Sequence, residues 1–316
     1  MKSFLLLFLA CSAASRAQPV GELKPQSLRV GFTCSVFLNM NRNDLEASFK
    51  GFTMVLGRKC GYLIDPQSHV YDSSKEFEAA IKAGAIDLAI IDTWKFLEMD
   101  IRTQMEPLFV STSPEGIGRR YLVLTSKSSG LRSIPQLQGK SIAECVDGNA
   151  NLGANWLETL LRTNQLGNQE TFFGTVETVV KPSAAVLPVF FGKKDACLLD
   201  QAGFDLMTEM NPQVGQALQV LAVSEPLANT ILCLRKSPWE AEAFRQTLVK
   251  ILSELHLDPA GQQLLTMFKT GPLVPFKEAH LATVRELRAR AGLTEGTAAL
   301  SRASTNAANA IAEPGL

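Results

Sequence analysis

Short apolar runs alternate with segments of helical spacing along the first third of the chain. The runs have the length of buried strands, and the segments between them place apolar side chains three or four positions apart. The predicted strands are residues 28–32, 61–64 and 88–91, and the predicted helices are residues 44–58 and 75–84. Ser73 or Ser74 caps the start of the second helix, and Gly84 ends it. This alternation predicts parallel βαβ units.

The same alternation restarts after a middle connector. The predicted strands are residues 120–126, 141–145, 171–176, 196–199, 217–223 and 231–234, and the predicted helices are residues 151–163 and 183–191, the second kinked at Pro188. The chain then turns helical, over residues 238–255, 259–268 and 277–291. Residues 294–316 are rich in Ala, Ser, Thr and Asn and lack apolar periodicity, which predicts a disordered tail.

One short pattern occurs once in each of the two stretches. Residues 80–92 and 189–200 both run from a helix end to an apolar strand, with the spacing G-x-x-D-x4-D. The glycine suits a left-handed helix cap, and the second acid, Asp92 or Asp200, falls at the carboxyl end of a strand. Open α/β sheets bind ligands at such strand ends. The repeat therefore favours a ligand-binding protein with two lobes.

Charge and composition argue against several classes of function. The 316 residues include 31 basic and 31 acidic side chains, whereas nucleic-acid binding normally needs a basic excess. We therefore expect no nucleic-acid partner. The three histidines are widely spaced and no CxxC occurs, so we expect neither a metal nor a cofactor. Nothing resembles a nucleophile elbow, a P-loop or a dinucleotide-binding glycine motif, and we expect no enzyme.

The N-terminus has the layout of an export signal. Lys2 supplies a positive charge, residues 4–10 form an apolar run too short to span a membrane, and small residues precede Gln18. We predict cleavage after Ala17, which makes residues 1–17 a signal peptide and the mature chain periplasmic. Lipid attachment at Cys11, within a poor lipobox, is the alternative.

Five cysteines remain after this cleavage. Export permits disulfides, and the odd number leaves at least one cysteine outside any intrachain pair. Burial as small apolar side chains is the simplest interpretation for most of them. Because Cys34 follows a predicted strand and Cys60 begins one, the two should lie at opposite edges of the sheet, and we predict no bond between them.

Residues 121–148 resemble the opening of the second lobe in type II periplasmic binding proteins. An extended crossover strand there leads into a turn and the next strand, and the matching positions are Ser129, Gly130, Leu131, Ile134, Leu137, Gly139 and Lys140. Residues 77–96 and 188–200 match two further blocks of the phosphate, phosphite and phosphonate binding proteins of ABC importers. The resemblance implies an α/β, two-lobed type II periplasmic-binding-protein fold, each lobe an open, mostly parallel sheet flanked by helices.

The resemblance also implies a domain organisation and a function. Lobe one would be residues 28–116 plus 231–293 and lobe two residues 117–230, with hinge crossings near residues 117–121 and 227–231. The lobes would close on a small polar ligand, which the protein would deliver to the permease subunits of an ABC importer in the inner membrane. We expect a monomer. The alternative is a periplasmic accessory or sensor protein of the same fold that acts with a partner protein and not in transport.

Three loops depart from the pattern of the family that this chain resembles. A Ser-Thr-Ser-Gly loop that holds the oxyanion is replaced by residues 150–153, of which only Gly153 matches. The Gly-Ser-His turn is replaced at residues 180–182, and the Gly-Pro…Tyr loop at residues 92–96. The ligand, and whether it is a phosphorus oxyanion, therefore stays open at this point.

Candidate ligand-binding residues come from the loops that follow the predicted strands. They are Thr33, Cys34, Tyr71, Asp92, Thr93 and Trp94 in the first lobe, and Asn149, Asn151, Lys181 and Asp200 in the second. Each also has a structural interpretation: a turn or helix cap for the polar residues, a core position for Trp94, and a solvated side chain for Lys181. Two acids and one base around one site favour a zwitterion or a polar neutral solute over a trianion.

Overall fold

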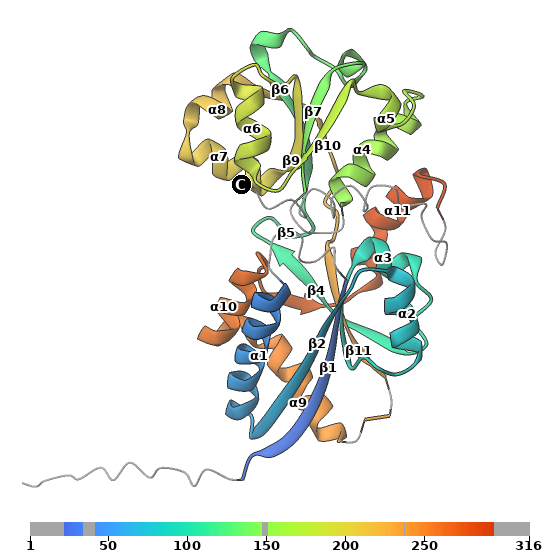
Figure 1. Cartoon of the computed structure of the whole chain (residues 1–316), viewed down its shortest axis with the longest axis vertical. Coiled ribbons are helices and arrows are strands. Elements are labelled where there is room, and N and C mark those ends of the chain that lie inside the picture. The colour runs from blue at the N-terminus through green and yellow to red at the C-terminus, as the bar shows by residue number, and fades with distance from the viewer. Residues whose placement is uncertain (1–21, 34–41, 147–150, 237, 240, 294–316) are drawn as a thin grey trace, which may run out of the picture.

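Two lobes, each built on its own sheet, make up the molecule (Figure 1). The computed structural model describes residues 22–33, 42–146, 151–236, 238–239 and 241–293. The predicted signal peptide, Cys11, Cys34, Asn149 and the predicted tail lie outside these residues.

The first sheet has the strand order β12-β4-β11-β3-β1-β2, with β5 paired to β4, and the second has the order β10-β6-β9-β7-β8. The strands of the first sheet are β1 (Lys24–Thr33), β2 (Tyr62–Tyr71), β3 (Leu88–Asp92), β4 (Met105–Ser113), β5 (Gly116–Ile117), β11 (Thr230–Arg235) and β12 (Leu273–Pro275). Those of the second are β6 (Tyr121–Ser126), β7 (Ser141–Cys145), β8 (Thr175–Val179), β9 (Ala196–Asp200) and β10 (Leu218–Val223).

Among the described residues, parallel pairing is confined to three strands in each sheet. β1 lies parallel to β2 and β3, and β7 lies parallel to β8 and β9. The remaining pairs, among them β11 with β3 and β6 with β9, are antiparallel. Each sheet is therefore mixed, and its parallel part is the part that the βαβ alternation predicts.

Helices cover both faces of each sheet. They are α1 (Arg42–Lys59), α2 (Ser74–Lys82), α3 (Thr93–Glu98), α4 (Leu152–Thr163), α5 (Gln169–Phe172), α6 (Pro182–Phe190), α7 (Gln201–Met210), α8 (Pro212–Ala217), α9 (Glu242–Ser253), α10 (Pro259–Met267) and α11 (Ala282–Arg290). In Figure 1, α1, α9 and α10 lie on one side of the first sheet and α2, α3 and α11 on the other. Among the described helices, none is long and apolar enough to cross a membrane.

The structure corrects one predicted strand and adds elements that the sequence pattern missed. The expected strand over residues 171–176 begins only at Thr175, because Asn168 caps a short helix over the preceding residues with hydrogen bonds to Thr171. β4 runs through the expected connector, α3 and α7 follow strands directly, and α8 follows α7. These three helices are short, and short helices leave little periodicity to detect.

Two chain crossings join the sheets and lie side by side. Arg119 and Leu227 form an antiparallel bridge, with both backbone N–H···O bonds at 2.9 Å. Gly118 has a φ of +92°, and a β-carbon at this position would lie 3.0 Å from the Leu227 backbone, so only glycine suits so close an approach. The predicted hinge regions therefore meet in space. α11 adds a further link, since it packs on α3 of the first lobe and α4 of the second.

Three apolar cores fill the molecule. One runs through both lobes on the side of α2, α3, α4 and α11, and contains Trp94, Tyr121 and Trp156. The second lies between the first sheet and α1, α9 and α10, around Phe32 and Phe244. The third lies between the second sheet and α6 to α8, around Val186 and Leu199. The strands whose ends carry the candidate residues are thus held in place by packed apolar side chains.

Candidate functional site

The carboxyl ends of the parallel strands in the first lobe bring three predicted residues together. Thr33 pairs with Tyr71 in the β1–β2 register, and its hydroxyl donates to Asp92 Oδ2 at 3.3 Å. Asp92 is 1% exposed, and its Oδ1 accepts from the backbone N–H of Lys95 at 2.7 Å. The carboxylate is therefore the N-cap of α3. Tyr71 is half-buried against Phe77, and burial raises the pKa of its hydroxyl.

Thr93 and Trp94 are oriented by contacts within the protein. The Thr93 hydroxyl donates to the Ala228 carbonyl at 2.5 Å, which ties the end of β3 to the second crossing. Trp94 is 7% exposed, and the Arg288 guanidinium lies 4.9 Å from the centre of its ring. One face of this indole therefore already holds a cation from the chain itself.

Asp200 forms a buried ion pair at the hinge. Its Oδ1 accepts from the Gly203 backbone N–H at 3.0 Å, which makes it the N-cap of α7. Its Oδ2 lies 3.2 Å from Arg119 Nη1, and both side chains are 10% exposed. Arg119 Nη2 also donates to the Lys269 carbonyl, at 2.8 Å, in the first lobe. Arg119 thus connects Asp200 to the other lobe, so a ligand amine would have to compete with this guanidinium for the carboxylate.

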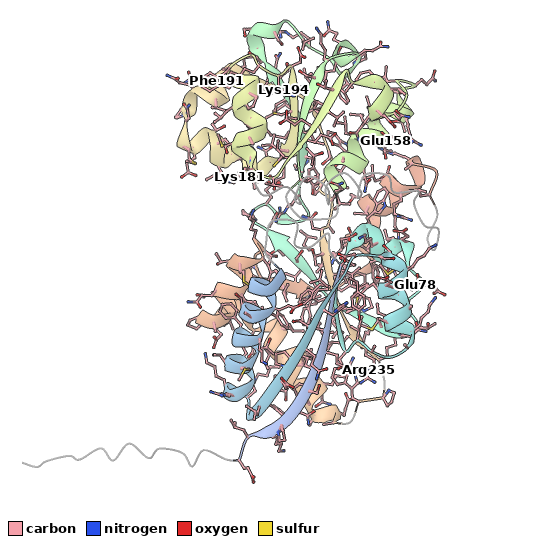
Figure 2. The ribbon with its side chains drawn as sticks, in the orientation of Figure 1. Glu78, Glu158, Lys181, Phe191, Lys194 and Arg235 are labelled. Atoms are coloured by element: carbon pink, nitrogen blue, oxygen red, sulfur yellow. The ribbon has the colours of Figure 1, made fainter. Side chains whose placement is uncertain are left out.

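Lys181 and Asn151 precede helices of the second lobe. Lys181 is exposed at the start of α6, and Figure 2 shows it at the end of the second lobe that is nearer the first. Asn151 precedes α4 in a left-handed conformation, with a φ of 50°, and its side chain makes no capping bond. Its Oδ1 is buried without a hydrogen-bond partner among the described residues.

Glu144 is a buried acid that the sequence analysis passed over. It lies next to last in β7 and is 6% exposed, and its Oε1 has no hydrogen-bond partner within the described part of the chain. Burial, reinforced by the nearby charge of Glu158, raises the pKa of its carboxyl from 4.5 to about 7. The signal for this residue was present: Glu144 is the charged residue inside the otherwise apolar strand 141–145.

Glu144 and the start of α4 line a small common cavity of about 10 Å³, which suits a single water-sized group. Asn151 and Gly153 form part of the wall. A β-carbon on Gly153 would lie 2.7 Å from the Tyr121 ring, so close packing explains why glycine occupies this position. The cavity therefore lies between a buried carboxyl and a helix start, whose first N–H groups have no partner inside the helix.

The described cysteines and acids give no support for a metal or redox centre. Cys60, Cys197 and Cys233 are free thiols, and burial raises the pKa of each. The prediction that Cys34 and Cys60 are not bonded stays a prediction, because Cys34 is outside the described residues. Within the part of the chain that the structure describes, no group of three or more His, Cys, Asp and Glu residues is placed to hold a metal ion.

The sequence matches one family model over residues 35–281. That family is described as the periplasmic substrate-binding protein of the phosphonate ABC transporter. No curated protein matches the chain.

Solved structures of binding proteins share the fold. A Xanthomonas citri protein bound to ATP is 14% identical, with a TM-score of 0.59, over 90% of this chain and 99% of its own. PhnD1 from Prochlorococcus marinus in complex with methylphosphonate is 15% identical, with a TM-score of 0.56, over 84% of this chain and 98% of its own. A binding protein component of a Pseudomonas aeruginosa phosphonate ABC transporter is 12% identical, with a TM-score of 0.57, over 84% of this chain and 86% of its own.

Proposed function

The chain belongs to the family of periplasmic substrate-binding proteins of phosphonate ABC transporters, and we propose that its ligand is a small oxyanion that still carries an acidic proton, such as a phosphonate. Proteins of this family bind a small molecule for a transporter. The observation that carries the proposal is the buried Glu144 carboxyl beside the start of α4. The proposed ligand replaces the zwitterion that the sequence favoured, since both acids of that hypothesis serve as helix caps.

Glu144 favours a ligand that can donate a hydrogen bond to its ionised carboxylate or accept one from its protonated form. An ionised carboxylate accepts hydrogen bonds and repels an oxyanion, whereas a protonated one donates. A phosphonate monoanion holds one acidic O–H, so one proton is available for the bond between ligand and Glu144. A sulfonate has no such proton at neutral pH. We therefore expect discrimination against sulfonates near the Glu144 pKa of about 7, where part of Glu144 is ionised and part of the phosphonate keeps its proton.

Positive potential for the ligand comes from two helix starts in the second lobe. α4 spans 12 residues, and its first N–H groups, like those of every helix, lack partners inside the helix. Lys181 adds a full charge before α6. The predicted residues Asn149, Asn151 and Lys181 thus enter the proposal as neighbours of the oxyanion, with Glu144 added. In the first lobe, Thr33, Cys34, Tyr71, Asp92, Thr93 and Trp94 are proposed as the opposing wall.

The organisation of the chain fits a closing, two-lobed binder. We assign residues 28–116 plus 231–293 to lobe one and residues 117–230 to lobe two, with the paired crossings at Arg119 and Leu227 as the hinge. The mature protein would begin at residue 18, act as a monomer in the periplasm and hand its ligand to ABC permease subunits. The alternative to cleavage after Ala17 is lipoprotein processing, with a lipid attached to Cys11.

Calorimetric titration of the chain from residue 18 onward tests the proposal. Methylphosphonate and phosphate should bind at pH 7, where the methylphosphonate monoanion is still present, and methanesulfonate, sulfate and ethanolamine should not. Lys181→Gln should weaken methylphosphonate binding, whereas Lys193→Gln, the same charge change at an exposed position beyond the other end of the sheet, should not. Binding of ethanolamine alone would restore the amine hypothesis. No binding of any member of the panel would favour the accessory or sensor alternative.

Glu144→Gln provides the sharper test of selectivity. The amide keeps the volume of the side chain but offers N–H donors at every pH. The variant should therefore gain methanesulfonate binding and lose the preference for a proton-bearing ligand. Unchanged selectivity in a folded variant would show that Glu144 does not contact the ligand.

A further inference from the structure

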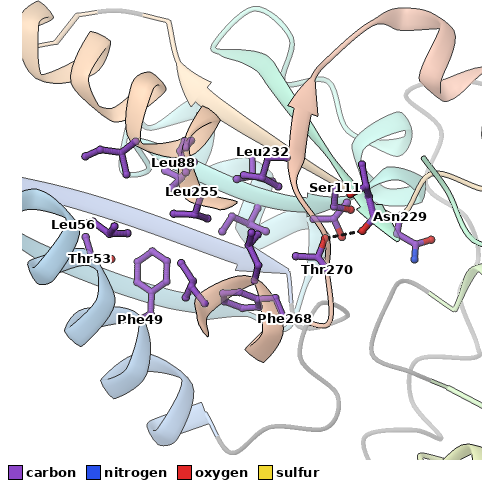
Figure 3. A pocket seen from close by; sticks show the side chains of 18 of the residues that line it. Phe49, Thr53, Leu56, Leu88, Ser111, Asn229, Leu232, Leu255, Phe268 and Thr270 are labelled. Carbon is purple, nitrogen blue, oxygen red and sulfur yellow. Dashed lines mark hydrogen bonds between the residues drawn. The ribbon is translucent and has the colours of Figure 1, made fainter. Parts of the chain in front are cut away.

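Lobe one contains a second cavity, partly open to solvent, larger than the one at Glu144 and separate from it. Its volume is about 100 Å³, several times the roughly 10–15 Å³ that a water molecule needs. It lies between the first sheet and α1, α9 and α10 (Figure 3). Its lining extends to the hinge residues Gly118 and Arg119. The cavity near Glu144 is in the other lobe.

Most of the cavity wall is hydrocarbon. Side chains of Leu, Ile and Phe from both the sheet and the helices form it, including Phe49, Leu88, Leu232, Leu248, Leu264 and Phe268. Well-packed cores contain few voids larger than one water molecule, and a void of this size forfeits dispersion contacts on all sides. Walls of this kind suit apolar ligands, as an engineered apolar cavity of about 150 Å³ takes benzene.

The end of the cavity near the hinge is polar. Figure 3 shows Ser111, Asn229 and Thr270 at this end, opposite Leu56. The Thr270 hydroxyl donates a hydrogen bond to the Thr112 carbonyl at 3.0 Å. The Ser111 residue is 9% exposed. Hydroxyl groups at one end of an apolar chamber suit a ligand that has one polar end and one hydrocarbon end.

The charge at this end is already balanced. Among the described residues that line the cavity, Arg119 alone is charged, and its guanidinium lies 3.2 Å from Asp200 and 2.8 Å from the Lys269 carbonyl. Asn229, with its amide oxygen turned toward the guanidinium, accepts a further bond from Arg119 Nε at 3.0 Å. An ionised ligand head would add an uncompensated buried charge, which is costly. The polar end therefore favours an uncharged head.

We propose that lobe one contains a second ligand site, which binds a short, unbranched alkyl compound with an uncharged hydroxyl or carbonyl head. The chain occupies the space between Phe49, Leu248 and Leu264, and the head lies beside Ser111 and Thr230. Scaled from the cavity of about 150 Å³ that holds the six carbons of benzene, the volume allows a chain of roughly four carbons. This site does not depend on the identity of the ligand bound near Glu144.

Methyl NMR with 1-butanol as the probe tests the proposal on the intact protein. The methyl groups of Leu248, Leu264 and Ile90 should shift saturably, and those of Leu187 and Leu206 in lobe two should not. 1-Chlorobutane, which has a similar size and no hydroxyl, should bind roughly two- to tenfold more weakly, the usual contribution of one neutral hydrogen bond. Ser111→Ala should reduce that preference. Equal binding of both probes would overturn the polar end of the proposal.

A variant that fills the cavity tests its location. Leu252→Phe adds carbon atoms from α9, and it should weaken 1-butanol binding at least tenfold while methylphosphonate titration is unchanged. Leu206→Phe, the same substitution at a position of α7 that is 52% exposed, is the matched control. If Leu252→Phe fails to fold, Leu264→Phe enters the same space from α10. Absence of saturable shifts in the wild-type protein would overturn the proposal without any variant.

Discussion

The two lobes use the same local structure at equivalent strands and differ in what surrounds it. In lobe one, Asp87 accepts from the backbone N–H of Arg29 at 2.9 Å, and in lobe two Asp195 accepts from that of Ser141 at 2.8 Å. Asp92 and Asp200 then cap the next helices through the N–H groups of Lys95 and Gly203. The spacing G-x-x-D-x4-D therefore encodes a backbone arrangement, strand start and helix cap together.

The equivalent positions differ in their chemistry. The strand registers make Phe32 the counterpart of Glu144, since these residues pair with Ile90 and Leu198 respectively. Phe32 is fully buried in an apolar core, whereas Glu144 brings a carboxyl to the same place in lobe two. Asp92 bonds to Thr33 within its own lobe, whereas Asp200 pairs with Arg119 at the hinge. At these two positions, lobe two therefore has a buried carboxyl and an ion pair where lobe one has an aromatic ring and a bond to a hydroxyl.

The largest difference between the lobes should appear when the hinge ion pair is cut. Arg119→Met removes the cation beside a buried Asp200, and we expect a loss of about 3–5 kcal/mol in unfolding free energy. Urea denaturation provides the measurement. Arg119→Met/Asp200→Asn should recover part of the loss. A loss below 1 kcal/mol in the single variant would mean that the ion pair does not stabilise the fold.

The difference between Phe32 and Glu144 predicts that stability depends on pH through Glu144 in lobe two and not through Phe32 in lobe one. The pKa of Glu144 is about 7 in the folded protein and near 4.5 when unfolded, so the folded state binds the proton more tightly. Stability should therefore fall as pH rises from about 4.5 to 7. At pH 8 Glu144→Gln should be more stable than the wild type by about 3 kcal/mol, at 1.36 kcal/mol per pKa unit.

Urea unfolding at pH 4.5 and pH 8 checks this prediction. The gain of Glu144→Gln should disappear at the lower pH. Phe32→Leu is the control in lobe one, and its destabilisation should be the same at both values. A pH-independent gain for Glu144→Gln would show that the carboxyl is not the titrating group.

The two strand-start acids should differ in their contribution to stability. Burial acts to raise the pKa of Asp87, but hydrogen bonds from Arg29 and Arg235 hold it below its usual value. Burial likewise opposes the hydrogen bonds from the Ser141 backbone and hydroxyl that lower the pKa of Asp195. Asp87→Asn should cost about 2–3 kcal/mol because it weakens charged bonds to two arginines, and Asp195→Asn about 1 kcal/mol.

Both losses should shrink as pH falls through the folded pKa values. A lowered pKa means that native contacts stabilise the ionised carboxylate, and this stabilisation is lost when the carboxylate is protonated. Thermal unfolding of the two variants at pH 7 and pH 3 gives the comparison. Equal losses at pH 7 would remove the distinction between the lobes at this position.

The smallest expected effect is at the strand end of lobe one. Thr33→Val removes the bond to Asp92 Oδ2 and keeps the shape of the side chain, and we expect a loss of about 0.5–1.5 kcal/mol. Its urea midpoint, set beside that of Arg119→Met, tests whether the hinge pair is the stronger of the two. A larger loss for Thr33→Val would reverse the comparison.

Local sequence information was sufficient for the βαβ repeats and the helix caps. The strands around residues 88–91 and 141–145 were identified because apolar runs and their bounding Asp, Gly and Ser residues lie within a few positions of each other. Ser73 caps α2 as expected, with its hydroxyl accepting from the Lys75 N–H. The prediction failed near residue 171, where the cap at Asn168 starts a short helix. It also missed β4, whose pairing with the distant strands β11 and β12 decides the structure.

Only the tertiary structure decided the chemistry of the candidate site. The sequence indicated that Asp92 and Asp200 stand at strand ends, because position in a strand is a local property. It gave no indication that Arg119 pairs with Asp200, 81 residues away, or that Glu144 is buried without a partner for Oε1. Ion pairs, burial and pKa depend on which distant side chains share a space, and the cavity in lobe one depends on helices at both ends of the chain.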